Sequence, residues 1–172
     1  MTPKIMGRWI GMFILAVGFV TANSSPIAAP STAATADRQS PDPMLRLEAS
    51  LRAERLAQES FPRFLSGAMG RTGATLPGSA VRVRGTTDTG ADGLFWVERI
   101  AVAADGFTGQ DLSDPARRHA FTLTDIVDWS HAGHDGRLHG NFGAREIAAV
   151  LPAQHAAQIV ATLSIAPYPR GW

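Results

Sequence analysis

The segment LFWVERIAVAADGFTGQDL, residues 94–112, predicts two antiparallel strands joined by a tight turn. β-branched and aromatic residues lie on both sides of Asp105-Gly106, and an Asp-Gly dipeptide between two such runs is a strong hairpin signal. Both faces of the first run are apolar: one carries Leu94, Trp96, Ile100 and Val102, and the other Phe95, Val97, Ala101 and Ala103. This pattern is typical of a central strand that is covered on both sides by helices or a second layer.

Three more runs of the same kind surround this hairpin. The five expected strands lie at residues 80–84, 94–104, 107–112, 119–129 and 138–142. Two further dipeptides, Asp92-Gly93 and Asp135-Gly136, separate neighbouring runs as hairpin signals. We therefore expect an antiparallel meander of about five strands.

Helical patterns flank the predicted sheet. Asp42-Pro43 supplies an N-cap residue and a proline at the first helical position, and we expect an amphipathic helix over residues 43–60. Its expected apolar face carries Met44, Leu47 and Leu51, with Leu45, Ala49 and Leu56 beside them. Pro62 disfavours helical geometry at Phe61 and is expected to end the helix, with a loop over residues 66–79. Two C-terminal helical stretches, 144–151 and 152–163, complete an α+β fold in one domain, residues 43–172.

The N-terminal residues indicate export. Lys4 and Arg8 precede an apolar run over residues 9–20, which is the architecture of a cleavable signal peptide, here residues 1–22. The run is too short for a permanent membrane anchor. Cleavage is expected after Ala22, with Ala36 as the second choice, and residues 23–42 are expected to form a disordered linker. A periplasmic or secreted location follows.

The amino-acid composition argues against several classes of function. Without Lys4 and Arg8, 14 of the 16 basic residues remain against 15 acidic ones, which does not favour nucleic-acid binding. The chain has no cysteine, so thiol chemistry, disulfides and a lipid-modified cysteine are excluded. No glycine arrangement resembles a phosphate-binding loop, and we expect no cofactor.

One order of features is specific enough to suggest a family. Gly109-x-x-Leu112-x-x-Pro115 is followed by Ile126-x-Asp128-Trp129 and then by Gly140-Asn141-Phe142. Over residues 61–150 the chain resembles the bacterial family known as domain of unknown function 2314. It departs from that family at Asp114, where Asn is usual, and at residues 141–143, where a Gly-Tyr-Thr-like turn is usual. The resemblance implies no established activity.

Two groups of polar residues are candidates for binding. Asp128 is expected to accept backbone N–H bonds of a following turn while Trp129 enters the core; the alternative is that Asp128 contacts a ligand. Glu98 in the central strand is expected to pair with an arginine, first of all Arg145, or else to line a binding groove. His131 completes the set of candidate binding residues.

A histidine-rich segment raises the alternative of a metal site. Asp128, His131, His134 and His139 together could hold zinc, yet their spacing in a turn does not direct them to one point, so an exposed loop is favoured over a metal site. The sequence thus predicts a non-catalytic binding or interaction module with an envelope protein or a small ligand as its partner. The alternative is a metal-assisted hydrolase centred on Asp128 and the three histidines.

Overall fold

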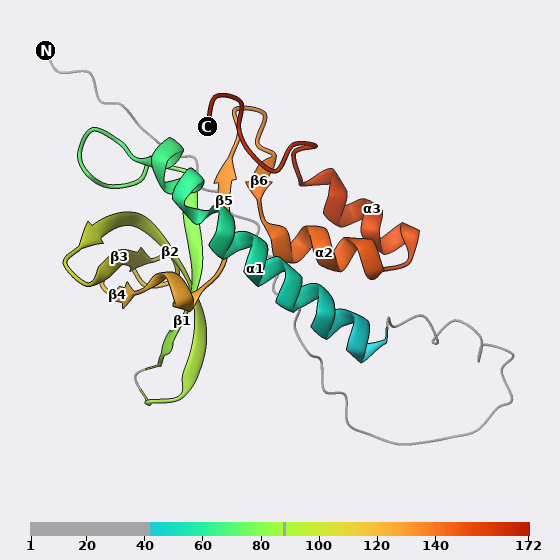
Figure 1. Ribbon diagram of the computed structural model, residues 1–172, viewed down its shortest axis with the longest axis horizontal. Helices are drawn as coiled ribbons and strands as arrows, with labels where there is room; N and C mark the ends of the chain where they lie inside the picture. The colour runs from blue at the N-terminus through green and yellow to red at the C-terminus, as the bar shows by residue number, and fades with distance from the viewer. Residues whose placement is uncertain (1–41, 88) are drawn as a thin grey trace, which may run out of the picture. The chain divides into compact units, whose positions relative to one another are not determined.

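The computed structural model describes residues 42–87 and 89–172. The expected signal peptide and all but the last residue of the expected linker lie outside the described residues. Within them, no helix is long and apolar enough to cross a bilayer. Figure 1 shows α1 lying across one face of the sheet, with α2 packed beside it.

Helices and strands are segregated along the chain, which confirms the α+β class. The elements are α1 (Pro43–Ala68), β1 (Ser79–Thr86), β2 (Asp92–Ala103), β3 (Gly106–Asp111), β4 (Arg118–Phe121), the 3-10 helix η1 (Leu123–Asp125), β5 (Ile126–Ala132), β6 (Leu138–Gly140), α2 (Phe142–Val150) and α3 (Ala153–Ala161). The strands form one antiparallel sheet in the order β4-β3-β2-β1-β5-β6. Strands β1 to β4 follow the expected meander, and β5 then returns to pair with β1.

The sheet has six strands because the expected strand 119–129 is interrupted. Oδ2 of Asp125 accepts hydrogen bonds from the backbone N–H and the hydroxyl of Thr122, both at 2.8 Å. These bonds stabilise η1 between β4 and β5. The chain thereby leaves the edge strand β4 and crosses to the far side of β1.

The Asp-Gly signals were correct at two positions and wrong at one. Asp105-Gly106 joins β2 to β3, and Gly136, with φ of 77°, lies in the turn between β5 and β6. Asp92 and Gly93 instead lie within β2, paired with Thr86 and Gly85 of β1. The turn lies before the dipeptide, where Gly90 adopts φ of 78° and the N–H of Thr87 donates to the carbonyl oxygen of Ala91 at 2.8 Å.

Strand β2 is covered on one face only, contrary to the sequence expectation. Its register to β3 shifts between Glu98 and Ala101, and Arg99 there adopts φ of 51°, as in a β-bulge. The extra residue places Val97 and Ile100 together in the core, both fully buried, whereas Val102 stays 64% exposed. Strict alternation therefore predicted the wrong faces beyond the bulge.

Helix α1 continues eight residues beyond its expected end and includes Pro62. The helical path places Phe61 and Phe64 in the core at 1% and 0% exposure, with the Phe61 ring centroid 5.1 Å from that of Phe107. Burying two phenyl side chains contributes several kcal/mol, by order of magnitude. That gain outweighs the hydrogen bond and the backbone preference that the proline removes.

The buried face of α1 is also different from the expected one. Alanines 49, 53 and 57 are buried, whereas Met44, Leu47 and Leu51 are 60%, 53% and 59% exposed. Small side chains allow the axis of α1 to approach its neighbours closely, and α2 packs along the same helix. Contact distance, more than side-chain hydrophobicity, therefore selects the inner face here.

Candidate functional site

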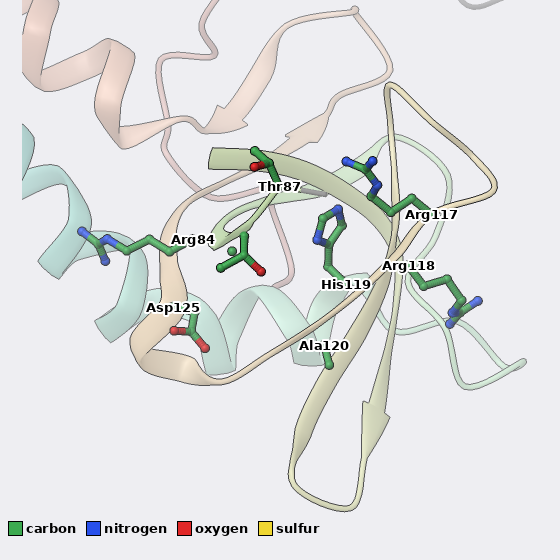
Figure 2. A pocket seen from close by; sticks show the side chains of 9 residues that line it. Arg84, Thr87, Arg117, Arg118, His119, Ala120 and Asp125 are labelled. Carbon is green, nitrogen blue, oxygen red and sulfur yellow. The ribbon is translucent and has the colours of Figure 1, made fainter. Parts of the chain in front are cut away.

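A pocket of about 520 Å³ lies between β1 and β4 (Figure 2). The sheet curls so that the edge strand β4 approaches β1 although two strands separate them in the sheet order. The lining residues are Arg84, Gly85, Thr86, Thr87, Arg117, Arg118, His119, Ala120 and Asp125. The residues that line this space thus include three arginines, one histidine and a single carboxylate, that of Asp125.

His119 is held in a defined orientation by Asp111. Nε2 of His119 lies 2.9 Å from Oδ2 of Asp111, a carboxylate that is 2% exposed. Burial alone would raise the pKa of Asp111, but hydrogen bonds from Ser113, His119 and Asp114 outweigh it and lower the pKa to about 2. Because the ionised carboxylate can only accept, Nε2 of His119 carries the proton in this bond.

The other ring nitrogen of His119 is open to the pocket. Nδ1 of His119 forms no hydrogen bond. Because every fully buried side-chain nitrogen or oxygen among the described residues has a hydrogen-bond partner, Nδ1 is not fully buried. The ring stacks on Phe95 at a centroid distance of 4.3 Å and projects from β4 toward Thr87 (Figure 2). In the neutral imidazole Nδ1 is then an acceptor that faces the pocket.

The arginines differ in how far they are already engaged. The guanidinium of Arg84 points toward α1 and makes a bidentate pair with the carboxylate of Glu54 (Figure 2). Arg118 donates from Nη2 to Oγ1 of Thr108 at 3.3 Å, which uses one of its five N–H donors. Arg118 directly precedes His119 on β4, and Figure 2 shows its side chain directed away from His119, whereas Arg84 is largely neutralised by Glu54.

Asp128 and Trp129 have structural roles in the arrangement observed. Oδ1 of Asp128 accepts from the N–H groups of Trp129 and Phe142, and Oδ2 accepts from the N–H of Gly143, all at 2.8 to 2.9 Å. The carboxylate thereby caps the first turn of α2. Burial raises the pKa of Asp128 to about 6, against the opposite effect of these bonds and of the charge on Arg82. Trp129 is fully buried, in agreement with the expectation for its indole.

The expected ion pair between Glu98 and Arg145 is not formed. Arg145 donates to the carbonyl oxygens of Gly140, Leu138 and Ser164, and so ties α2 to β6 and to the segment after α3. Glu98 lies half-buried on β2, next to the bulge. The prediction was wrong because Arg145 follows a sharp turn, Gly140 with φ of 67°, that directs it to nearby carbonyls.

The three histidines do not share one environment. His131 is half-buried, with Nδ1 2.9 Å from Oγ of Ser79, and burial and the nearby His139 and His134 lower its pKa. Nδ1 of His139 is 3.0 Å from the carbonyl oxygen of Ala166, and His134 is exposed. Within residues 42–87 and 89–172, no group of three metal-ligating side chains lies close enough together to hold an ion.

Sequence reasoning missed the pocket residues. The sequence offers one signal, the segment Arg117-Arg118-His119. It contains the only two consecutive arginines in the sequence. Strand β4 was hidden within a longer apolar run, and the pairing of His119 with Asp111 depends on the register of β3 with β4.

Comparison of the chain with models of protein families, with curated proteins and with solved structures found no match. The resemblance to domain of unknown function 2314 therefore stays a prediction from the residues.

Proposed function

We propose that the domain is a non-catalytic binding module that is exported to the periplasm and holds its ligand in the pocket between β1 and β4. The observation that carries the proposal is the lining of that pocket. It places an oriented imidazole, whose Nδ1 forms no hydrogen bond, beside the polar side chains of Thr87 and Asp125. The volume of this pocket lies within the range of small-molecule sites, and its polar groups can fix the orientation of a ligand.

The roles of the other polar clusters support binding over catalysis. The oxygens of Asp128 are occupied by backbone N–H groups, and Arg145 is occupied by three carbonyl oxygens. Membership of the domain of unknown function 2314 family is part of the same proposal and adds no chemistry to it.

The binding site can be tested by blocking the pocket. Ala120 is exposed and lines the pocket, so Ala120→Trp should fill it, and Ala116→Trp on the adjacent exposed turn is a matched control. We expect amide resonances of residues 84–87 and 117–120 to shift in 15N spectra when the domain is titrated with pools of metabolites and short peptides. The shifts should vanish in Ala120→Trp and persist in Ala116→Trp. Ligands that shift only other residues, or that bind both variants equally, would refute the pocket as the site.

Export is tested separately. Expression in a Gram-negative host should yield a periplasmic product that begins at Asn23 or, second, at Asp37. An intact Met1 on a membrane-bound product would contradict this part of the proposal.

A further inference from the structure

The N-terminal half of α1 carries an apolar stripe that stays exposed in the described part of the chain. The exposed fraction is 60% for Met44, 53% for Leu47 and 59% for Leu51. Spacings of three and four residues place these side chains on one face of the helix. Ala49 and Ala53 are buried and mark the opposite face, which packs on the domain. Figure 1 shows this end of α1 running past the sheet, beside α2. Large apolar side chains gathered on an exposed face mark a surface for association.

The 3-10 helix η1 extends this apolar surface. Nε2 of Gln58 donates to the carbonyl oxygen of Thr124 at 3.4 Å, which places η1 beside α1. Leu123 of η1 is 43% exposed. Gln58 lies seven residues after Leu51 and therefore on the same face of α1. The apolar surface thus continues from the exposed stripe toward Leu123.

The charges beside the stripe are complementary to those of a second copy. Glu48 and Arg55 are seven residues apart, so they lie on the same flank of the stripe. Glu48 is exposed, and the Arg55 side chain is 67% exposed and 3.9 Å from Glu59, a loose pair that leaves donors for another carboxylate. When a two-fold axis relates two antiparallel helices, residues of the same flank meet. With the axis beside Leu51, Glu48 of each copy lies opposite Arg55 of the other.

The same arrangement gives the apolar residues their contacts. The two Leu51 side chains lie against each other next to the axis. Leu47 of one copy lies at the level of residues 55–58 of the other, where η1 presents Leu123. Because the buried face of each α1 points away from the stripe, the bodies of the two copies lie on opposite sides of the helix pair. Contact over about four turns of each helix buries about 1,000 Å² in total, at the low end for specific interfaces, so the dimer is weak.

A second copy fits the stripe better than a lipid surface or the preceding residues of the chain. Residues 43–60 carry three arginines and three glutamates, which gives no net attraction to anionic lipid. Residues 23–41 contain one large apolar residue, Ile27, and so supply too few apolar side chains to cover the stripe.

We propose that two copies of the chain associate through antiparallel contact of their α1 helices, with Met44, Leu47 and Leu51 in the interface and reciprocal ion pairs between Glu48 and Arg55. The contact does not involve the ligand pocket, so it stands or fails separately from the proposed function. With the expected dissociation constant of about 100 μM, the chain is monomeric at concentrations of a few micromolar.

Sedimentation equilibrium of residues 23–172 from about 10 μM to about 1 mM tests the association. We expect a monomer–dimer equilibrium that Leu51→Glu weakens by more than about tenfold, because each substituted residue meets its own counterpart next to the axis. Val102→Glu replaces an equally exposed apolar residue on β2, at 64% exposure, and should leave the equilibrium unchanged. A chain that stays monomeric at about 1 mM, or equal effects of the two substitutions, would overturn the proposal.

Charge reversal tests the antiparallel register. Glu48→Arg and Arg55→Glu should each weaken self-association about fivefold, because each puts like charges opposite one another twice. An equimolar mixture of these two variants should regain the wild-type affinity, since the mixed dimer has two attractive pairs. Arg137→Glu, on the turn between β5 and β6, is the control and should have no effect. Failure of the mixture to associate would refute this register, and binding of a monomeric chain to phosphatidylglycerol vesicles that Leu51→Glu abolishes would assign the stripe to a lipid surface instead.

Discussion

The indole Nε1 of Trp129 donates a hydrogen bond of 2.9 Å to Oγ of Ser60, which lies 69 positions earlier in the chain. Both residues are buried, and the bond joins β5 to α1 at the centre of the core. The Trp129 ring also contacts Phe64 and Phe142, with centroid distances of 4.9 and 5.5 Å. The Trp129 side chain thus links β5 to both α1 and α2.

Replacing Trp129 should therefore test the core directly. Trp129→Ala removes a fully buried indole and should lower the free energy of unfolding by about 3–5 kcal/mol. Trp129→Phe keeps most of the ring but loses the bond to Ser60, and should cost about 1–3 kcal/mol. Ser60→Ala is the control for the bond alone. Urea unfolding measures all three, and a cost below about 1 kcal/mol for Trp129→Ala would contradict this account of the core.

The buried carboxyl of Asp128 should make stability depend on pH. Burial raises its pKa in the folded state to about 6, above the value of 3.8 for an exposed Asp, so between these pH values the native state binds the proton more tightly than the unfolded state. The free energy of unfolding should then fall as pH rises from about 4 to about 7, by up to about 3 kcal/mol. Asp128→Asn lacks this titration. The stability difference between wild type and variant should be largest near pH 4 and smallest above pH 7 in urea unfolding, and a difference that is constant or grows with pH would refute the assignment.

The two faces of α1 should respond to mutation in the opposite order to their hydrophobicity. Leu51 is 59% exposed, so Leu51→Ser should change the free energy of unfolding by no more than about 0.5 kcal/mol. Ala53 is 3% exposed in the core, so Ala53→Leu should destabilise the domain by about 1–3 kcal/mol through overpacking. Thermal unfolding of both variants shows which face of α1 is buried. Marked destabilisation by Leu51→Ser alone would show that α1 buries its leucine face.

The zinc alternative has its own measurement. Because Asp128 caps α2 and the three histidines have separate environments, we expect less than stoichiometric zinc in the domain purified without chelator and dialysed against zinc. His134→Ala should leave the melting temperature unchanged since His134 is exposed. Stoichiometric zinc that is lost in a variant lacking His131, His134 and His139 would restore the metal-assisted hydrolase as a candidate.

Local patterns in the sequence were sufficient for the fold class and for several elements. The Asp105-Gly106 turn follows from the preference of Gly for positive φ, here 139°, and the start of α1 follows from Asp42, whose carboxylate accepts the N–H of Met44 at 2.8 Å. The burial of Trp129 follows from its size and position. The turn and the start of α1 depend on neighbours a few residues away, which the sequence displays directly.

Other features depend on residues that are distant in the sequence, and only the tertiary structure decided them. Helix α1 passes through Pro62 because Phe61 packs against Phe107, and the alanine face turns inward because α2 lies against it. The pocket exists because the sheet curls until β4 approaches β1, and His119 meets Asp111 only through the pairing of β3 with β4. Burial and cross-strand register are properties of the assembled chain, so no local pattern of residues 117–119 could specify their position beside residues 84–87.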